Sequence, residues 1–271
     1  MNHDERVVAV LDILGYSRLM ETYSLDRLEE LIVAGLMGTL GTAKLLSGEA
    51  IVVGSAGQLY EYADLVEIEY GIISDTIVLY PKPRVPDPLT ALCTTVSVLM
   101  SDLLSSGLLL RGGIAVDTFR AIKGHPIYLG RALIAAHKIE MGQEWSGCAL
   151  SPRIRRKFPR ESKLLRSKGL IVDYDIPFKS EVSSRERSRL ALNWFHFSLG
   201  DYVEKAATLR RLLADAPEFA KEKVRSAISF MSFLEKQGLS ASAPVSKKLF
   251  DRSRVGGTYR FAPRDPDMRQ R

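Results

Sequence analysis

Residues 7–17 read Val-Val-Ala-Val-Leu-Asp-Ile-Leu-Gly-Tyr-Ser, and this stretch decides the fold. Five apolar residues lead into Asp12, a run that is typical of a buried strand. A carboxylate in such a strand costs free energy unless a cation, hydrogen-bond donors or a metal ion accompany it. A second aspartate, Asp75, lies in a similar setting, within Ile-Ile-Ser-Asp-Thr-Ile-Val-Leu-Tyr at residues 72–80. Two such carboxylates in one domain suggest a shared divalent ion and phosphoryl-transfer chemistry.

Length and composition indicate a soluble globular protein. The 271 residues allow one large domain, or one domain with an appendage. No uninterrupted apolar run reaches the roughly 18 residues that span a bilayer, and the charged residues 1–6 do not resemble a signal peptide. Cys93 and Cys148 are expected to be reduced thiols. We therefore expect a cytoplasmic protein without a membrane span.

The net charge of +6 is concentrated late in the chain, at residues 153–157 and 247–271. A basic tail can contact nucleic acid or anionic lipid. The run has no interleaved aromatic residues and belongs to no nucleic-acid module. We expect a solvated, flexible tail and no nucleic-acid partner.

Periodicity predicts the order β-α-β-β-α-β-(β)-α-β-β over the first 175 residues or so. A strand covers residues 6–14. A helix with a capping box at Asp26 and Glu29 runs from there to about residue 47. Two strands within residues 63–80 meet in a tight turn at Ser74-Asp75. Asp87 caps the next helix.

The later segments predict a strand at 108–116, a helix at 130–140 and short strands at 149–150 and 170–172. Helices are then expected at 190–199, 202–213 and 219–234. The predicted fold class is α/β (α+β): a mixed, mostly antiparallel sheet with helices packed on it. We expect a catalytic domain at 1–178, a helical extension at 179–240 and a tail at 241–271.

Four segments in this order resemble class III nucleotidyl cyclases, the adenylate and guanylate cyclase family. They are Asp-Ile-Leu-Gly-Tyr at 12–16, Ser-Asp at 74–75, Arg-Gly-Gly-Ile at 111–114 and Gly-Arg-Ala-Leu-Ile-Ala-Ala-His-Lys-Ile-Glu at 130–140. The resemblance covers residues 6–175 and implies a ferredoxin-like sheet.

The resemblance also implies roles for particular residues. Asp12, Asp75 and the Ile13 carbonyl would hold two Mg²⁺ or Mn²⁺ ions, one at the ribose 3′-hydroxyl and one at the β- and γ-phosphates. The backbone amides of Leu14, Gly15 and Tyr16 would hold the triphosphate.

Cations on other elements are the remaining candidates. Lys138 occupies the place of the family's transition-state arginine, although it lacks the bidentate fork. Arg111 and Arg131 are further candidates for contacting phosphate. Arg111 could instead be structural, paired with a carboxylate at the end of the sheet.

The departures from the family bear on the choice of base. Purine cyclases read the base with a lysine at the position of Gly71 and often an aspartate at the position of Ile127, and neither residue here can do so. Ile134 replaces an asparagine that positions the ribose. By strand position alone, Tyr70 is our candidate for contacting a smaller pyrimidine.

This pattern resembles the pyrimidine cyclases of bacterial antiphage Pycsar systems. The resemblance implies that UTP or CTP becomes the 3′,5′-cyclic nucleotide, a signal to a separate effector, with uracil favoured over cytosine. It also implies a homodimer whose two chains share each site. Alternatives are a purine cyclase of the same fold, an inactive nucleotide-binding or sensory module, and a diguanylate cyclase relative, although the sequence has no Gly-Gly-Asp/Glu-Glu-Phe turn.

Overall fold

The computed structural model describes residues 4–33, 68–184, 187–196, 202–216 and 218–239. The predicted end of the first long helix near residue 47 lies outside these residues. So does the basic tail at 241–271.

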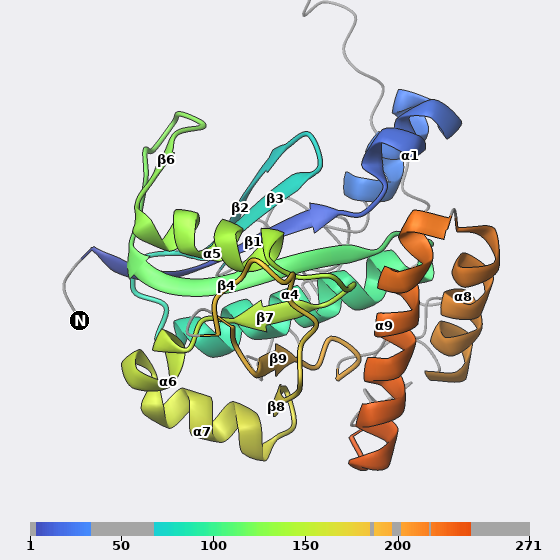
Figure 1. The fold of residues 1–271 in the computed structure, drawn as a ribbon. Coiled ribbons are helices and arrows are strands. Elements are labelled where there is room, and N and C mark those ends of the chain that lie inside the picture. The colour runs from blue at the N-terminus through green and yellow to red at the C-terminus, as the bar shows by residue number, and fades with distance from the viewer. Residues whose placement is uncertain (1–3, 34–67, 185–186, 197–201, 217, 240–271) are drawn as a thin grey trace, which may run out of the picture.

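A seven-stranded sheet in the order β2-β3-β1-β4-β7-β9-β8 forms the centre of the chain (Figure 1). Only β4 and β7 pair in parallel; the other neighbours in this sheet are antiparallel. The strands are β1 (Glu5–Ile13), β2 (Ile68–Ile73), β3 (Thr76–Pro81), β4 (Leu110–Thr118), β7 (Cys148–Leu150), β8 (Ile171–Asp173) and β9 (Leu190–Leu192). A separate hairpin joins β5 (Arg120–Ala121) to β6 (Tyr128–Leu129). The predicted mixed, mostly antiparallel α/β fold is confirmed.

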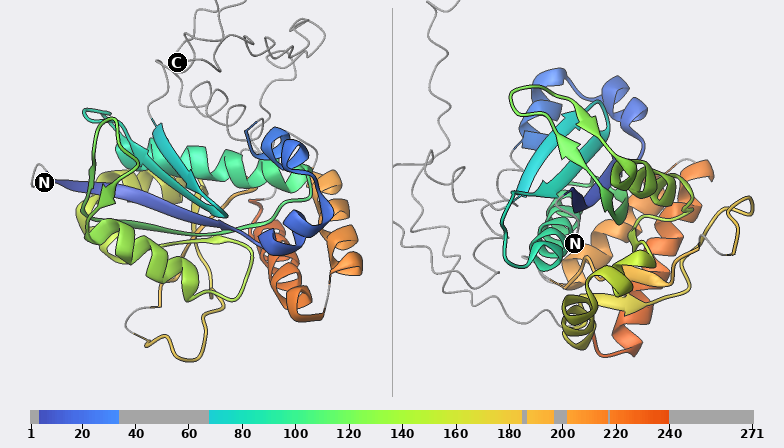
Figure 2. Two further views of the ribbon diagram at one scale, coloured as in Figure 1. Left: turned by 90° about the horizontal axis from the view of Figure 1, so that it is seen from above. Right: turned by 90° about the vertical axis from the view of Figure 1, so that its left-hand side faces the viewer.

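Two long helices cover opposite faces of the sheet (Figure 2). Ala9 and Leu11 of β1 join the core that contains α4 (Pro88–Ser105). Val8 and Val10 instead pack with Ala132 and Ala136 of α5 (Arg131–Met141). Successive side chains of a strand point to opposite faces, so Asp12 lies on the α5 face with Val8 and Val10.

Helix α4 begins as its sequence predicts. The Asp87 carboxylate accepts a hydrogen bond from the Thr90 amide at 3.3 Å, and Pro88 occupies the first turn. By length and composition alone this helix could cross a membrane, but 72% of it is buried inside the structure. Such burial is typical of a core helix.

The structure corrects three predictions. Ser24 caps the helix that begins at residue 25, with its hydroxyl accepting from the Arg27 amide at 3.3 Å, so Asp26 lies inside the first turn. Residues 190–192 are not helical but form β9, between β7 and β8. The sheet therefore continues beyond the predicted boundary at residue 178. Two helices, α6 (Arg153–Lys157) and α7 (Pro159–Ser167), were not expected.

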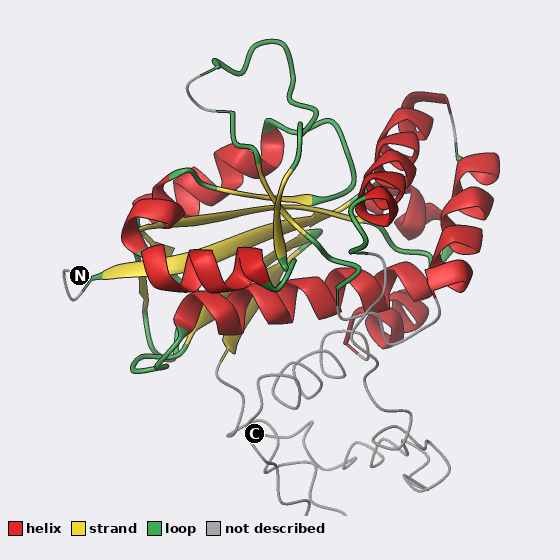
Figure 3. Ribbon diagram, turned by 90° about the horizontal axis from the view of Figure 1, so that it is seen from below, coloured by secondary structure: helices red, strands yellow, loops and turns green. Residues whose placement is uncertain are grey.

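Within residues 202–216 and 218–239, two helices follow the sheet, α8 (Tyr202–Asp215) and α9 (Glu218–Lys236), and they pack on each other (Figure 3). The Tyr202 hydroxyl donates to the Met231 carbonyl at 2.8 Å. Lys205 of α8 is 1% exposed and donates to the Ser101 carbonyl of α4 at 2.9 Å. These contacts attach the predicted C-terminal helices to the core.

Candidate functional site

Asp12 and Asp75 lie together at one end of β1. The Ile13 amide donates to the Asp75 carbonyl at 3.0 Å, which ties β1 to the turn between β2 and β3. Ser74 in that turn has a left-handed φ of 59°. Burial raises the pKa of Asp12, the Arg111 guanidinium opposes that rise, and the like charge of the nearby Asp75 adds to it. The fold thus brings together the two carboxylates that the sequence singled out.

Arg111 of the neighbouring strand β4 contacts Asp12 of this pair and a third carboxylate, Glu140. Its Nε donates to Glu140 Oε1 at 2.6 Å, and its Nη2 lies 3.5 Å from Asp12 Oδ2. Arg111 is 7% exposed and Glu140 is 1% exposed. Burial raises the pKa of Glu140, while Arg111 opposes that rise. A guanidinium enclosed and paired in this way supports the structural role for Arg111 over the predicted phosphate contact.

Lys223 is a cation at this site that sequence reasoning missed. It comes from α9, where its carbonyl accepts from the Ser146 amide at 3.4 Å. The Ser146 hydroxyl in turn donates to the Leu110 carbonyl at 3.0 Å, directly before Arg111. Burial, followed by the charge of Arg111, lowers the pKa of Lys223, and the charge of Asp12 opposes this. Only the tertiary fold reveals that a lysine of the C-terminal helices lies near Asp12.

The donors at this site fit a magnesium or manganese ion bound together with a substrate. Mg²⁺ usually takes one or two carboxylates and completes its shell with phosphate oxygens and water. Asp12 and Asp75 supply two carboxylates, while the third nearby carboxylate, Glu140, is engaged by Arg111. In the described part of the chain, no group of three or more His, Cys, Asp or Glu side chains could hold a metal ion. The Ile13 carbonyl remains a predicted ligand.

The segment after β1 only partly suits the predicted triphosphate cradle. The Leu14 amide donates to the Leu109 carbonyl at 2.9 Å, so it cannot serve a phosphate. Gly15 precedes α1 (Tyr16–Thr22) with a φ of 77°, a left-handed conformation that glycine adopts readily. The amides of Gly15 and Tyr16 remain candidates.

The predicted cations of α5 lie on the face of this helix that points away from the sheet. Arg131 and Lys138 are exposed, and so is Ile134 at 59%, whereas Ala132, Ala136 and Glu140 face the sheet. Arg131 begins α5 next to Thr118, seven residues along β4 from Arg111, which lies beside Asp12. At about 3.3 Å per strand residue, that separation is about 23 Å. Arg131 is therefore far from the aspartates of its own chain, whereas Lys138 lies near the other end of α5 and points to solvent, not to the sheet.

The surroundings of Gly71 explain why this position has no side chain. A Cβ there would lie 2.0 Å from the hydroxyl of Tyr128. The Tyr128 ring contacts Tyr80 and Phe119, with centroids 5.9 and 6.4 Å away. A lysine at position 71 would have to displace this packed ring.

Tyr70, the predicted pyrimidine contact, lies on the wrong face of β2. Gly71 pairs with Val78, which packs on the α5 side, whereas Tyr70 pairs with Leu79, which packs on the α4 side. Adjacent strand residues point to opposite faces, so Tyr70 points away from the face that carries Gly71 and Asp12. Tyr128 occupies the space beside Gly71 instead.

No family model matches this chain, and no curated protein matches it. Among solved structures, the dimeric guanylyl cyclase domain of the RhoGC fusion protein from the aquatic fungus Blastocladiella emersonii is similar over 60% of this chain and 84% of that one, at 14% identity and a TM-score of 0.35. The adenylate/guanylate cyclase/hydrolase from Silicibacter pomeroyi is similar over 69% of this chain and 94% of that one, at 16% identity and a TM-score of 0.33. A rhodopsin-guanylyl cyclase core with converted specificity, in complex with ATPαS, is similar over 69% of this chain and 92% of that one, at 13% identity and a TM-score of 0.37. TM-scores this low carry no argument, so the site itself must support any functional conclusion.

Proposed function

We propose that this chain is a metal-dependent nucleotide cyclase that acts on a pyrimidine nucleoside triphosphate, UTP before CTP. The observation that carries the proposal is the meeting of Asp12 and Asp75 at the end of β1, with Arg111 beside Asp12. Two adjacent carboxylates repel each other unless a cation is shared, and a substrate triphosphate would complete the shell of that cation.

The reaction would be an in-line displacement at the α-phosphorus. The ribose O3′ forms the new bond, the bond to the β-phosphate oxygen breaks, pyrophosphate leaves, and the 3′-hydroxyl proton passes to solvent. Bound Mg²⁺ or Mn²⁺ would lower the pKa of that hydroxyl and neutralise phosphate charge. Arg111 would fix the orientation of Asp12, and Lys223 would add positive charge near the leaving pyrophosphate.

The preference for a pyrimidine is supported by what surrounds Gly71. A lysine cannot be placed there without moving Tyr128, and Ile127 offers no hydrogen bond to a purine edge. We propose by the resemblance that the cyclic nucleotide is a cytoplasmic signal to a separate effector in antiphage defence.

The proposed active unit is a homodimer in which α5 of one chain faces the aspartates of the other. Apolar side chains are exposed on the β2–β3 hairpin, on β6 and on α5, namely Ile73 at 58%, Leu129 at 56% and Ile134 at 59%. The two hairpins touch through Tyr80 and Tyr128, and Figure 1 draws them on the same side of the molecule as α5. A second copy that covered this surface would bring its Lys138 toward the site.

Subunit mixing tests both the aspartates and the shared site. Asp75→Asn and Lys138→Ala are each expected to lower turnover of UTP with Mn²⁺ by about a hundredfold or more. An equimolar mixture, allowed to exchange subunits, should regain up to about a quarter of wild-type activity, because half of the dimers are mixed and each contains one intact site. A mixture no more active than either variant would overturn the shared site. Full activity of Asp75→Asn alone would overturn the metal-dependent mechanism.

A further inference from the structure

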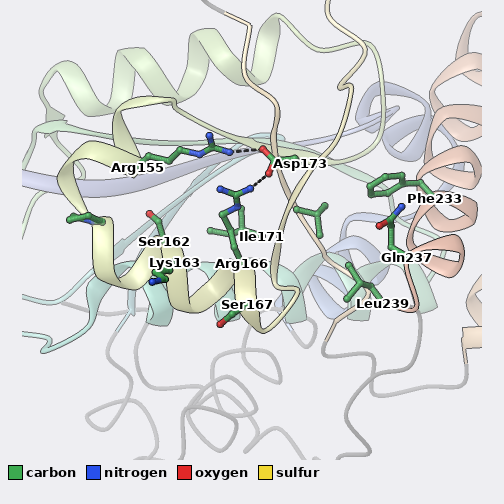
Figure 4. Close-up of a pocket in the computed structure, with 12 residues that line it drawn as sticks. Arg155, Ser162, Lys163, Arg166, Ser167, Ile171, Asp173, Phe233, Gln237 and Leu239 are labelled. Carbon is green, nitrogen blue, oxygen red and sulfur yellow. Dashed lines mark hydrogen bonds and ion pairs between the residues drawn. The ribbon is translucent and has the colours of Figure 1, made fainter.

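A hollow of about 660 Å³ lies far from the candidate site, between α6, α7, β8 and α9 (Figure 4). β8 is the edge strand of the sheet, and β4, β7 and β9 separate it from β1. Four strand spacings of about 4.8 Å put this hollow roughly 19 Å from the strand that carries Asp12. The volume is in the range of small-molecule sites.

Two guanidinium groups converge on one carboxylate in this hollow. Arg155 of α6 lies 2.5 Å from Asp173 Oδ1, and Arg166 of α7 is paired with Asp173 Oδ2. Figure 4 shows both arginines reaching Asp173 from the same side. Each guanidinium has five N–H donors and spends only part of them on Asp173, so donors remain for a second anion.

The lining carries more positive charge than this single acid balances. Lys163 adds a third cation, which leaves three basic side chains and one acidic one among the lining residues. Arginine pairs suit phosphate in particular, since the planar fork matches two oxygens of the group at once.

The opposite wall is apolar and aromatic. Phe233 of α9 lines this side of the hollow together with Leu239 (Figure 4). The Phe233 ring is held by Tyr174 and Phe230, at centroid distances of 5.0 and 6.2 Å. A fixed ring opposite a basic wall suits a ligand that is anionic at one end and flat or apolar at the other.

We propose that this hollow binds a phosphorylated small molecule that carries a ring, of the size of a nucleoside monophosphate. Its phosphate would share Arg155 and Arg166 with Asp173, and its ring would lie against Phe233. The proposal depends on these residues alone and is independent of the proposed cyclase activity.

Isothermal titration calorimetry on the full chain, in excess EDTA, tests this site with UMP, AMP, inorganic phosphate and uridine as probes. EDTA removes divalent ions, which the Asp12 site requires for a phosphate ligand. At least one of the two nucleotides, UMP or AMP, should bind at one saturable site per chain. It should bind more tightly than inorganic phosphate and more tightly than uridine. Arg166→Gln should weaken nucleotide binding about tenfold or more.

Two further variants are informative: one should strengthen nucleotide binding, and the other is a control that should leave it unchanged. Asp173→Asn should tighten nucleotide binding, because it frees both guanidiniums while the surface ion pairs that it removes contribute little stability. Arg160→Gln removes the same charge from the exposed side of α7 and should change nothing. The proposal is overturned if no nucleotide binds saturably, if Arg166→Gln and Arg160→Gln behave alike, or if Asp173→Asn weakens binding.

Discussion

Glu140→Gln is expected to destabilise the chain and to impair the candidate site together. Glu140 is 1% exposed and accepts from Arg111 Nε at 2.6 Å, while a second contact to Nη2 measures 2.5 Å. Removing one partner of a buried ion pair costs about 3–5 kcal/mol. The glutamine amide keeps one hydrogen bond, and Asp12 still lies 3.5 Å from Arg111. We therefore expect a loss of about 3 kcal/mol, the lower end of that range.

Urea unfolding and the Mn²⁺ dependence of turnover measure the two effects. A loss of this size shifts the urea midpoint by about 1 M. With its main partner neutralised, Arg111 should move onto Asp12 and compete with the metal, so half-maximal activity should require about tenfold more Mn²⁺. Glu144→Gln, at an exposed position, is the matched control. If Glu140→Gln costs no more stability than Glu144→Gln, the ion pair does not organise this site.

Three further predictions concern other parts of the molecule. Burial lowers the pKa of Lys205 from 10.5 to about 8, so the unfolded chain holds this proton at pH values where the folded chain has lost it. The free energy of unfolding should therefore rise with pH, by about 3 kcal/mol between about pH 8 and 10.5. Chemical denaturation at each pH measures this rise, and Lys205→Met should lack it. Gly71→Ala should lower the free energy of unfolding by about 1–3 kcal/mol, because the new methyl group meets Tyr128. Adding Tyr128→Ala should make Gly71→Ala less costly, and an unchanged cost would mean that another neighbour causes the loss. Lys223→Met should lower turnover about tenfold or more in steady-state assays, whereas Lys236→Met, at an exposed position, should not. Equal turnover by the two variants would mean that Lys223 has no role at the site.

Local sequence patterns predicted the elements whose signals lie within a few residues. The apolar run before Asp12, the turn at Ser74-Asp75 and the Asp87 cap each depend on neighbours in the chain, and the structure contains all three. β9 was missed because three apolar residues in a strand have no measurable period and resemble a piece of helix. α6 was not predicted because its five residues contain one apolar side chain, the buried Ile154, and a single apolar residue defines no helical period.

The site was predictable where it followed strand positions and unpredictable where it depended on packing. The meeting of Asp12 with Asp75 follows from a strand end and an adjacent hairpin. Arg111 is buried against Glu140, about 30 residues later in the chain, and Lys223 of α9 lies about 110 residues after Arg111. No local sequence pattern connects segments so far apart. Tyr70 points to the face of β2 opposite to that of Gly71, which was predictable from sequence because successive residues of a strand point to opposite faces.

Product analysis with each of the four nucleoside triphosphates and Mn²⁺ tests the central claim most directly. Wild-type protein and Asp12→Asn would be incubated in parallel, and the cyclic nucleotides separated and identified by mass. We predict cyclic UMP as the main product, with cyclic CMP second, formed by the wild type and reduced about a hundredfold or more in Asp12→Asn. Equal or greater conversion of ATP or GTP would contradict the pyrimidine preference. Unchanged product formation by Asp12→Asn would contradict the metal-dependent site.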